Sequence, residues 1–227
     1  RLLARLYVDL MRGIPVLVLI LFTYYGLALF GVNVAAFWAG VIALGAFATM
    51  HMLNAIGKGG GPLVTALLPL VGGLAGMAAG VVLGYVTTRK AGTTFAMITL
   101  GIGELVAACS LMFPAVFGGE GGVSGNRVVG KDSFLGFTWG PQVEMYGLIV
   151  LWAFACTIAM FALTQTPLGR MANAVRDNPE RAEFVGYDTE RVRFLMVILS
   201  GFFAGVAGGL SALNYEIVTA ETLNAHT

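Results

Sequence analysis

The sequence contains few charged residues, few cysteines and few histidines. Charged side chains make up 11% of the 227 residues, whereas a soluble domain usually carries about 25%. Hydrophobic residues make up 58% of the chain, and its mean hydropathy is +0.85. So few charges cannot give the molecule a polar surface, and we therefore expect lipid to cover much of it.

The charge balance and the shortage of reactive side chains exclude several functions. A net charge of +1 provides no basic face for phosphates, which argues against nucleic acid as a partner. Cys109 and Cys156 lie inside apolar runs, so we predict buried hydrophobic roles and neither a disulfide framework nor a metal site. No Ser/His/Asp, Cys/His or paired-carboxylate arrangement indicates an enzyme. The chain begins at Arg1 without a cleavable signal peptide, and we expect it to be a fragment.

Six stretches are long and apolar enough to be membrane spans, which need about 20 residues. Backbone polar groups in lipid must be satisfied within a helix or a closed barrel. We therefore predict an all-α fold, a polytopic helical membrane protein with about six transmembrane or re-entrant helices. The six runs are 13–31, 36–56, 63–86, 93–117, 145–164 and 194–213.

Glycines recur every four residues in two of these runs, which places them on one face of each helix. Small residues at this spacing let two helix backbones approach closely. We expect tight helix packing at Gly72, Gly76, Gly80 and Gly84, and at Gly201, Gly205 and Gly209.

The distribution of Lys and Arg predicts which loops face the cytoplasm, because short cytoplasmic loops are rich in both. Seven lie in the segments 89–90 and 170–193, against three in the loops of the opposite side. The loop at 165–193 is therefore expected to be cytoplasmic, and the glycine-rich loop at 118–144 to face outward. Six complete spans would place the first three Arg residues outside, which the same rule disfavours. Either one of the first runs is re-entrant, or an upstream span is missing.

The cytoplasmic loop contains two helix-start signals. Ten of the 25 charged residues lie between Arg170 and Arg193, with equal numbers of each sign. Thr166 can cap a helix that begins at Pro167, and Asn178 can cap a second short helix. Gly186 can end the second helix. We predict a pair of short helices at the membrane surface, either a solvated connector or a docking element for a cytoplasmic protein.

Three motifs in order resemble those of branched-chain amino acid ABC transporter permeases. They are TTFAMITL at 93–100 with Glu104, FGGEGGVSG at 117–125, and the loop motif TPLGR at 166–170, AVRDNPERA at 174–182 and VGY at 185–187. The resemblance covers about residues 49–215. Residues of about 4–43 look more like a polar amino acid permease of the histidine/glutamine type, including YVDLMRGIP at 7–15 and YYGL at 24–27. This resemblance suggests that the front of the chain is a divergent or chimeric join.

The resemblance implies a single permease domain over 1–227, with a coupling loop at 165–193 and further membrane segments beyond the last residue. It implies cytoplasmic ABC ATPase subunits that bind the ATP, a second permease subunit, and a periplasmic or extracellular substrate-binding protein. The chain itself would need no cofactor. The residues expected to couple to the ATPase are Arg170, Met171, Ala174, Arg176, Asp177, Glu180, Ala182 and Gly186.

Glu104 is the only acidic residue within the six runs. A charge near the middle of a bilayer costs about 2.5–3.5 kcal/mol, so Glu104 should face protein or water. Two roles remain open: polar packing, or a part in the substrate path or its gating. The second role would involve the glycine-rich turn as well, at Gly118, Gly119, Gly122 and Gly125.

Other polar residues outside the loop carry less information. The segment GNRVVGK at 125–131 matches part of a phosphate-binding loop, but Asp132 stands where Ser or Thr should hold magnesium. We therefore reject an ATP site there. His51 and Asn54, near the end of a run, are expected to be interfacial polar groups.

The most consistent hypothesis is a permease subunit of an ABC importer that moves branched-chain or related small amino acids across the inner membrane. An ion-coupled carrier normally has several ionisable groups within the membrane, and these runs contain Glu104 as their only acidic residue. A secondary carrier or channel for small amino acids or amides is the alternative. A membrane-embedded enzyme is a third class.

Overall fold

The computed structural model describes residues 36–56, 61–88, 93–128 and 139–219. The predicted span at 13–31 lies outside the described residues, as does most of the segment at 4–43. The longer helices are α3 (Ala36–Ile56), α4 (Pro62–Thr87), α5 (Thr93–Met112), α7 (Gln142–Gln165) and α10 (Thr189–Tyr215). The shorter elements are α6 (Pro114–Phe117), the 3-10 turn η2 (Gly119–Gly121), β1 (Val123–Ser124), α8 (Pro167–Asp177), α9 (Pro179–Phe184) and β2 (Ile217–Val218).

Four of the described helices, α3, α4, α7 and α10, are long and apolar enough to cross a membrane. They correspond to four of the predicted runs, and they confirm the class of helical membrane protein. Only described residues contribute to this number, so the prediction of about six spans stays a prediction.

The predicted run at 93–117 is not one helix. α5 ends at Met112, the chain turns at Phe113, and α6 then begins at Pro114. A proline lacks the backbone N–H and clashes with the preceding turn, so it begins a helix more readily than it continues one. Gly118, with a φ of 72°, ends α6 in the left-handed conformation that glycine adopts without strain.

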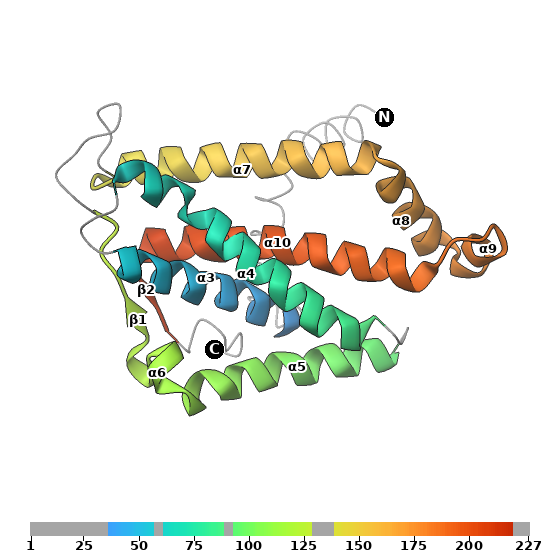
Figure 1. Ribbon diagram of the computed structural model, residues 1–227, viewed down its shortest axis with the longest axis horizontal. Helices are drawn as coiled ribbons and strands as arrows, with labels where there is room; N and C mark the ends of the chain where they lie inside the picture. The colour runs from blue at the N-terminus through green and yellow to red at the C-terminus, as the bar shows by residue number, and fades with distance from the viewer. Residues whose placement is uncertain (1–35, 57–60, 89–92, 129–138, 220–227) are drawn as a thin grey trace, which may run out of the picture.

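The centre of the bundle consists of α3, α4 and α10, and α4 and α10 contact each other along most of their length (Figure 1). Glycines make this approach possible. A Cβ atom built on Gly76 would lie 2.3 Å from the carbonyl oxygen of Gly201, and one on Gly205 would lie 2.2 Å from that of Gly72. α3 joins the same crossing, since a Cβ atom on Gly45 would lie 2.6 Å from the Cα atom of Gly205.

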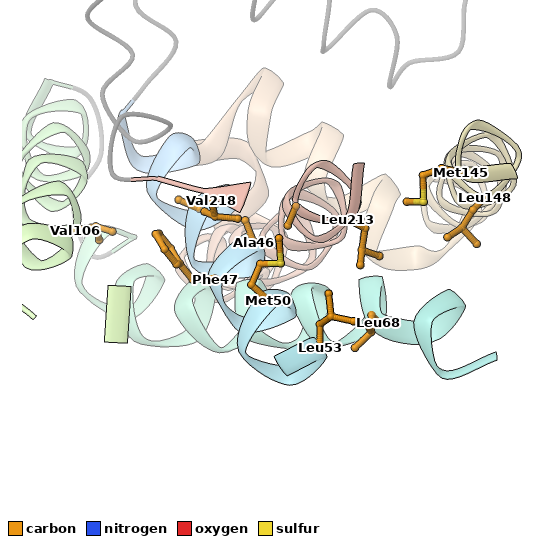
Figure 2. Close-up of a cluster of buried hydrophobic side chains, with 12 residues drawn as sticks. Ala46, Phe47, Met50, Leu53, Leu68, Val106, Met145, Leu148, Leu213 and Val218 are labelled. Carbon is orange, nitrogen blue, oxygen red and sulfur yellow. The ribbon is translucent and has the colours of Figure 1, made fainter. Parts of the chain in front are cut away.

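Larger side chains fill the space beside this crossing (Figure 2). Met50 of α3, Leu68 of α4 and Leu213 of α10 are fully buried in one cluster. Met145 and Leu148 of α7 extend the cluster on one side, and Phe47 and Val106 extend it toward α5. The core therefore connects all five long helices.

The two ends of the bundle differ in structure (Figure 1). At one end β1 pairs with β2 in antiparallel fashion, with Val123 opposite Val218. α6 and the starts of α4 and α7 lie at the same end, which we call the outer end after its predicted sidedness. α8 and α9 lie at the opposite end, here called the inner end. The glycine-rich turn thus lies at the outer end of the bundle, and the charged loop lies at the inner end.

Candidate functional site

The inner end carries a compact loop that begins where α7 turns into α8. Thr166 caps α8, because its hydroxyl oxygen accepts a hydrogen bond from the amide of Gly169 at 3.3 Å. The same hydroxyl donates to the carbonyl oxygen of Leu163 at 2.6 Å. A Cβ atom on Gly169 would lie 2.4 Å from that carbonyl oxygen, so the turn is tight. The end of α7 and the start of α8 are therefore closely joined.

The second short helix, α9, begins and ends at the residues the sequence indicates. The side chain of Asn178 accepts a hydrogen bond from the amide of Arg181 at 3.0 Å, and Pro179 is the first helical residue. Gly186 has a φ of 95°, a left-handed conformation, and it follows the helix end closely. Asp188 then caps α10 by accepting from the amide of Arg191 at 3.0 Å. The prediction of two short capped helices is confirmed.

A small hydrophobic cluster makes the loop a folded unit. Val175 of α8, Ala182 of α9 and Val192 of α10 are buried together, and Met171 and Ala172 pack against them. Thr189 donates a hydrogen bond to Glu183 at 2.7 Å and adds a polar link between α9 and α10. α8 and α9 are thus packed on the end of α10 as one folded unit.

The predicted coupling residues fall into two groups. Ala182 is only 5% exposed and Met171 is half-buried, so both support the loop from within. Arg176 and Asp177 form an exposed ion pair of 3.2 Å with each other, a contact of little stabilising value. The exposed members are Arg170, Ala174, Arg176, Asp177, Glu180 and Gly186.

Two apolar residues of the loop were not selected from the sequence. Phe184 is 90% exposed and Val185 is 73% exposed, both at the end of α9. Adjacent exposed apolar side chains outside a membrane span are candidates for a contact with a partner or a membrane surface. The signal was present, since these residues interrupt an otherwise polar segment, but periodicity alone does not show which face of a six-residue helix is covered.

The second group of candidate residues is spread over α5 and the outer end. Glu104 is exposed on α5, eight residues before Met112, or about 12 Å along the helix axis. Gly118, Gly119 and Gly122 all have positive φ values and form the turn after α6. Gly125 lies against α3, where an added Cβ atom would be 2.9 Å from Oδ1 of Asn54. Three of the four glycines form this turn, Gly125 follows β1, and Glu104 lies on the helix that leads to the turn.

Arg127 is an important residue that the sequence reasoning used only as a charge in the outer loop. It is 7% exposed, and it bonds to carbonyl oxygens at the end of α10 and in the turn before α7. Nothing in its local sequence indicates this role. Its partners lie 12 to 89 residues away, beyond the range of a motif.

His51 and Asn54 also hold the outer end together. Nε2 of His51 bonds to the carbonyl oxygen of Val116 in α6. The side-chain amide of Asn54 donates to the carbonyl oxygen of Ser124 in β1 at 3.0 Å. Both side chains therefore fix the glycine-rich turn to the end of α3. In the part of the chain that the structure describes, no group of three or more His, Cys, Asp or Glu residues could hold a metal ion.

Comparison with known proteins gives a consistent result. The family model described as the permease component of the branched-chain amino acid transport system matches residues 14–226. The match includes most of the front segment, so the resemblance of residues 4–43 to polar amino acid permeases is not supported. No solved structure matches the chain.

The curated relatives are permeases as well. The chain is 28% identical over 205 residues to the high-affinity branched-chain amino acid transport system permease protein LivM of Salmonella typhimurium, covering 82% of this chain and 47% of that protein. It is 27% identical over 205 residues to LivM of Escherichia coli, again covering 82% of this chain and 47% of that protein. It is 27% identical over 149 residues to the fructose import permease protein FrcC of Rhizobium meliloti, covering 62% of this chain and 40% of that protein.

The chain spans about half the length of the LivM proteins it matches. Their names describe transport permeases rather than enzymes. Together with the four long apolar helices, these matches show that the chain is a multi-pass protein of the bacterial inner membrane and belongs to the family of branched-chain amino acid transport permeases.

Proposed function

We propose that this chain is the transmembrane permease subunit of an ATP-binding-cassette importer for branched-chain or related small amino acids. In this proposal the chain performs no catalysis and has no cofactor. A separate cytoplasmic ATPase binds the ATP, a second permease subunit completes the path, and a substrate-binding protein delivers the substrate at the outer end. Residues 1–227 form one permease domain, and residues 165–193 form its coupling loop.

The observation that carries this proposal is the shape of the loop at the inner end. Its own hydrophobic cluster packs α8 and α9 against the start of α10, yet Phe184 and Val185 remain exposed. A shallow cavity of about 280 Å³ lies beside them between α8 and α9, and its lining includes Ala174 and Val185. A folded surface with an apolar centre and a charged rim fits a protein partner.

The contact proposed here differs in detail from the one expected from sequence. Phe184, Val185 and Ala174 would be the apolar centre, whereas Ala182 and Met171 would hold the loop in shape. Arg170 and Glu180, both exposed, would lie at the rim and set orientation through charge pairs.

Variants of the loop test the proposal in the full-length transporter. We expect Phe184→Asp to weaken ATPase binding by at least about 2 kcal/mol, or about 30-fold, because a charge would enter the apolar centre of the contact. Ala174→Glu should act in the same direction. Val128→Asp, at an exposed apolar position of the outer end, is the matched control and should bind normally. Pull-down of the ATPase and substrate uptake in vesicles are the two measurements.

Deletion of residues 168–186 distinguishes the two transport classes. An ATP-driven importer should lose uptake together with ATPase binding. Uptake that continues without the loop would contradict the ATP-driven mechanism and support the alternative, a secondary carrier or channel.

We further propose that Glu104 faces the substrate path or the second permease subunit, together with the glycine-rich turn at Gly118, Gly119, Gly122 and Gly125. Support comes from its exposure near the middle of α5, because a carboxylate against lipid would cost about 2.5–3.5 kcal/mol. Glu104→Gln keeps the size of the side chain and removes its charge. If the residue lines the path, this variant should change uptake while membrane insertion stays normal. Normal uptake would leave only a packing role.

A further inference from the structure

Arg127 is a buried cation with an unusually complete set of partners. Its Nε donates to the carbonyl oxygen of Trp139 at 2.8 Å. Nη1 donates to the carbonyl oxygens of Leu213 at 3.3 Å and Asn214 at 3.1 Å, and Nη2 to that of Gly140 at 3.2 Å and to Oε1 of Gln142 at 3.1 Å. A guanidinium group has five N–H donors in a fixed planar arrangement. The surroundings of Arg127 therefore match a guanidinium group in particular.

These partners belong to two structural elements that are distant in the sequence. Leu213 and Asn214 are in the last turn of α10, where carbonyl oxygens have no helical partner and favour a cation. Gly140 and Gln142 lie where α7 begins. Glu216 adds to the same junction, since Oε1 accepts from the backbone amide of Arg127 at 3.2 Å and lies 3.7 Å from Nε. Arg127 thus joins the end of α10 to the start of α7.

α7 has buried residues in its outer half, whereas its inner end is connected to α10 through the packing of α8. Near the outer end Met145 and Leu148 are buried, and the indole N–H of Trp152 donates to the carbonyl oxygen of Ala66 at 2.9 Å. The last buried residue of α7 is Cys156, and none of residues 157–165 is buried. Figure 1 shows α7 along one side of the bundle, with α8 at its inner end.

The helix on the other side of the junction cannot shift easily. α10 crosses α4 with backbone atoms in direct contact at Gly76 and Gly201, and it crosses α3 at Gly45 and Gly205. Closely packed interiors resist gradual deformation. A displacement of α8 must first open its packing against Val192 of α10. α7 is then expected to tilt relative to α10, and not α10 relative to α4.

We propose that Arg127 is a positioning residue that pins the outer end of α7 to α10 and so makes this end the pivot of α7 during transport. This inference rests on the proposed function, in which an ATPase moves α8. α7 has 24 residues and is about 36 Å long. A tilt of about 10° about its outer end displaces its inner end by about 6 Å. The junction would convert movement at the inner end into a rotation of α7 with little change at the outer end.

Distances between pairs of spin labels in the purified full transporter test the pivot. One pair, at Phe161 and Leu195, reports on the inner ends of α7 and α10, and a second pair, at Val143 and Ser211, reports on the outer ends. All four side chains are exposed. Between the nucleotide-free and the vanadate-trapped states, we expect the inner distance to change several times more than the outer distance. Equal changes at both ends, or no change at the inner end, would overturn the proposal.

Variants then test the role of Arg127 itself. With Arg127→Gln we expect the distribution of the outer distance to broaden in both states. We also expect the number of substrate molecules transported per ATP hydrolysed to fall several-fold. Asn126→Ala, an exposed neighbour whose side chain accepts only the amide of Val128 among its described hydrogen bonds, should leave both unchanged. If Arg127→Gln does not fold, Gln142→Ala removes one acceptor of Arg127 together with the hydrogen bond from Gln142 to Asn214, and it should broaden the distribution of the outer distance to a smaller extent. If the variant that folds shows the same distribution of the outer distance as the wild type, the proposal is overturned.

Failure of this inference can be distinguished from failure of the proposed function. If the ATPase copurifies with the wild-type permease but the two ends of α7 move equally, the pivot is wrong and the docking proposal stands. If the ATPase does not bind at all, nothing displaces α8, and both the docking proposal and the pivot are overturned.

Discussion

The close crossing of α4 and α10 predicts that the smallest possible enlargement of a glycine will destabilise the protein. In Gly205→Ala the new Cβ atom would lie 2.2 Å from the carbonyl oxygen of Gly72 and 3.0 Å from the Cα atom of Gly76, whereas ordinary contact begins at 3.4 Å. The obstructing atoms are backbone, so no side chain can rotate away. The two helices must separate locally by about 1 Å, the difference between these distances.

The expected cost follows from this geometry. Overpacking usually destabilises by about 1–3 kcal/mol, and separation at Gly205 also loosens the neighbouring contact at Gly76 and the crossing with α3. We expect Gly205→Ala to lower the free energy of unfolding by at least this amount, measured by denaturant titration in detergent micelles. Gly76→Ala should have a similar effect, since its Cβ atom would lie 2.3 Å from the carbonyl oxygen of Gly201.

Two comparisons make the prediction specific. Gly147→Ala is the matched control on α7, because no atom lies within 4 Å of its Cβ position; its stability should match that of wild type or exceed it by up to about 1 kcal/mol, since Ala favours a helix more than Gly does. In the double variant Gly76→Ala/Gly205→Ala, the second change should cost less than it does alone, because the helices have already separated. A Gly205→Ala protein as stable as Gly147→Ala would refute the close-approach argument.

Three further predictions concern the ends of the bundle. A cysteine at Glu183 should react with an impermeant reagent only from the cytoplasmic side, and one at Asn126 only from outside; the reverse pattern would overturn the sidedness. Gly186→Ala should cost about 1 kcal/mol, because its φ of 95° is strained for any residue with a Cβ atom, and unchanged thermal stability would contradict this. Asn178→Ala should remove the cap of α9 at a similar cost, seen as faster proteolysis at α9 than at α8; equal rates at both helices would argue against an energetic role for the cap.

Much of the fold could be predicted because its signals are local. The helices α4, α8 and α9 each begin at a proline, and a residue with a capping side chain precedes both α8 and α9. The apolar runs correspond to the spans because a helix in lipid needs only length and hydrophobicity. The break after α5 was missed although Pro114 marks it, because the hydrophobic pattern continues through it. The candidate loop was found for the same local reasons, whereas its contact with an ATPase stays a prediction.

The sequence by itself determined the membrane class, the two capped helices of the loop and the glycine faces, since each depends on residues within a few turns of one another. Tertiary structure alone decided that Ala182 turns inward while Phe184 turns outward, because a six-residue helix has no hydrophobic period long enough to define a face. It also decided the role of Arg127, whose burial is tolerable only where carbonyl oxygens from α10 and from the start of α7 converge. Such convergence depends on how the helices are arranged in space, and residues 12 to 89 positions apart in the chain give no local sign of it.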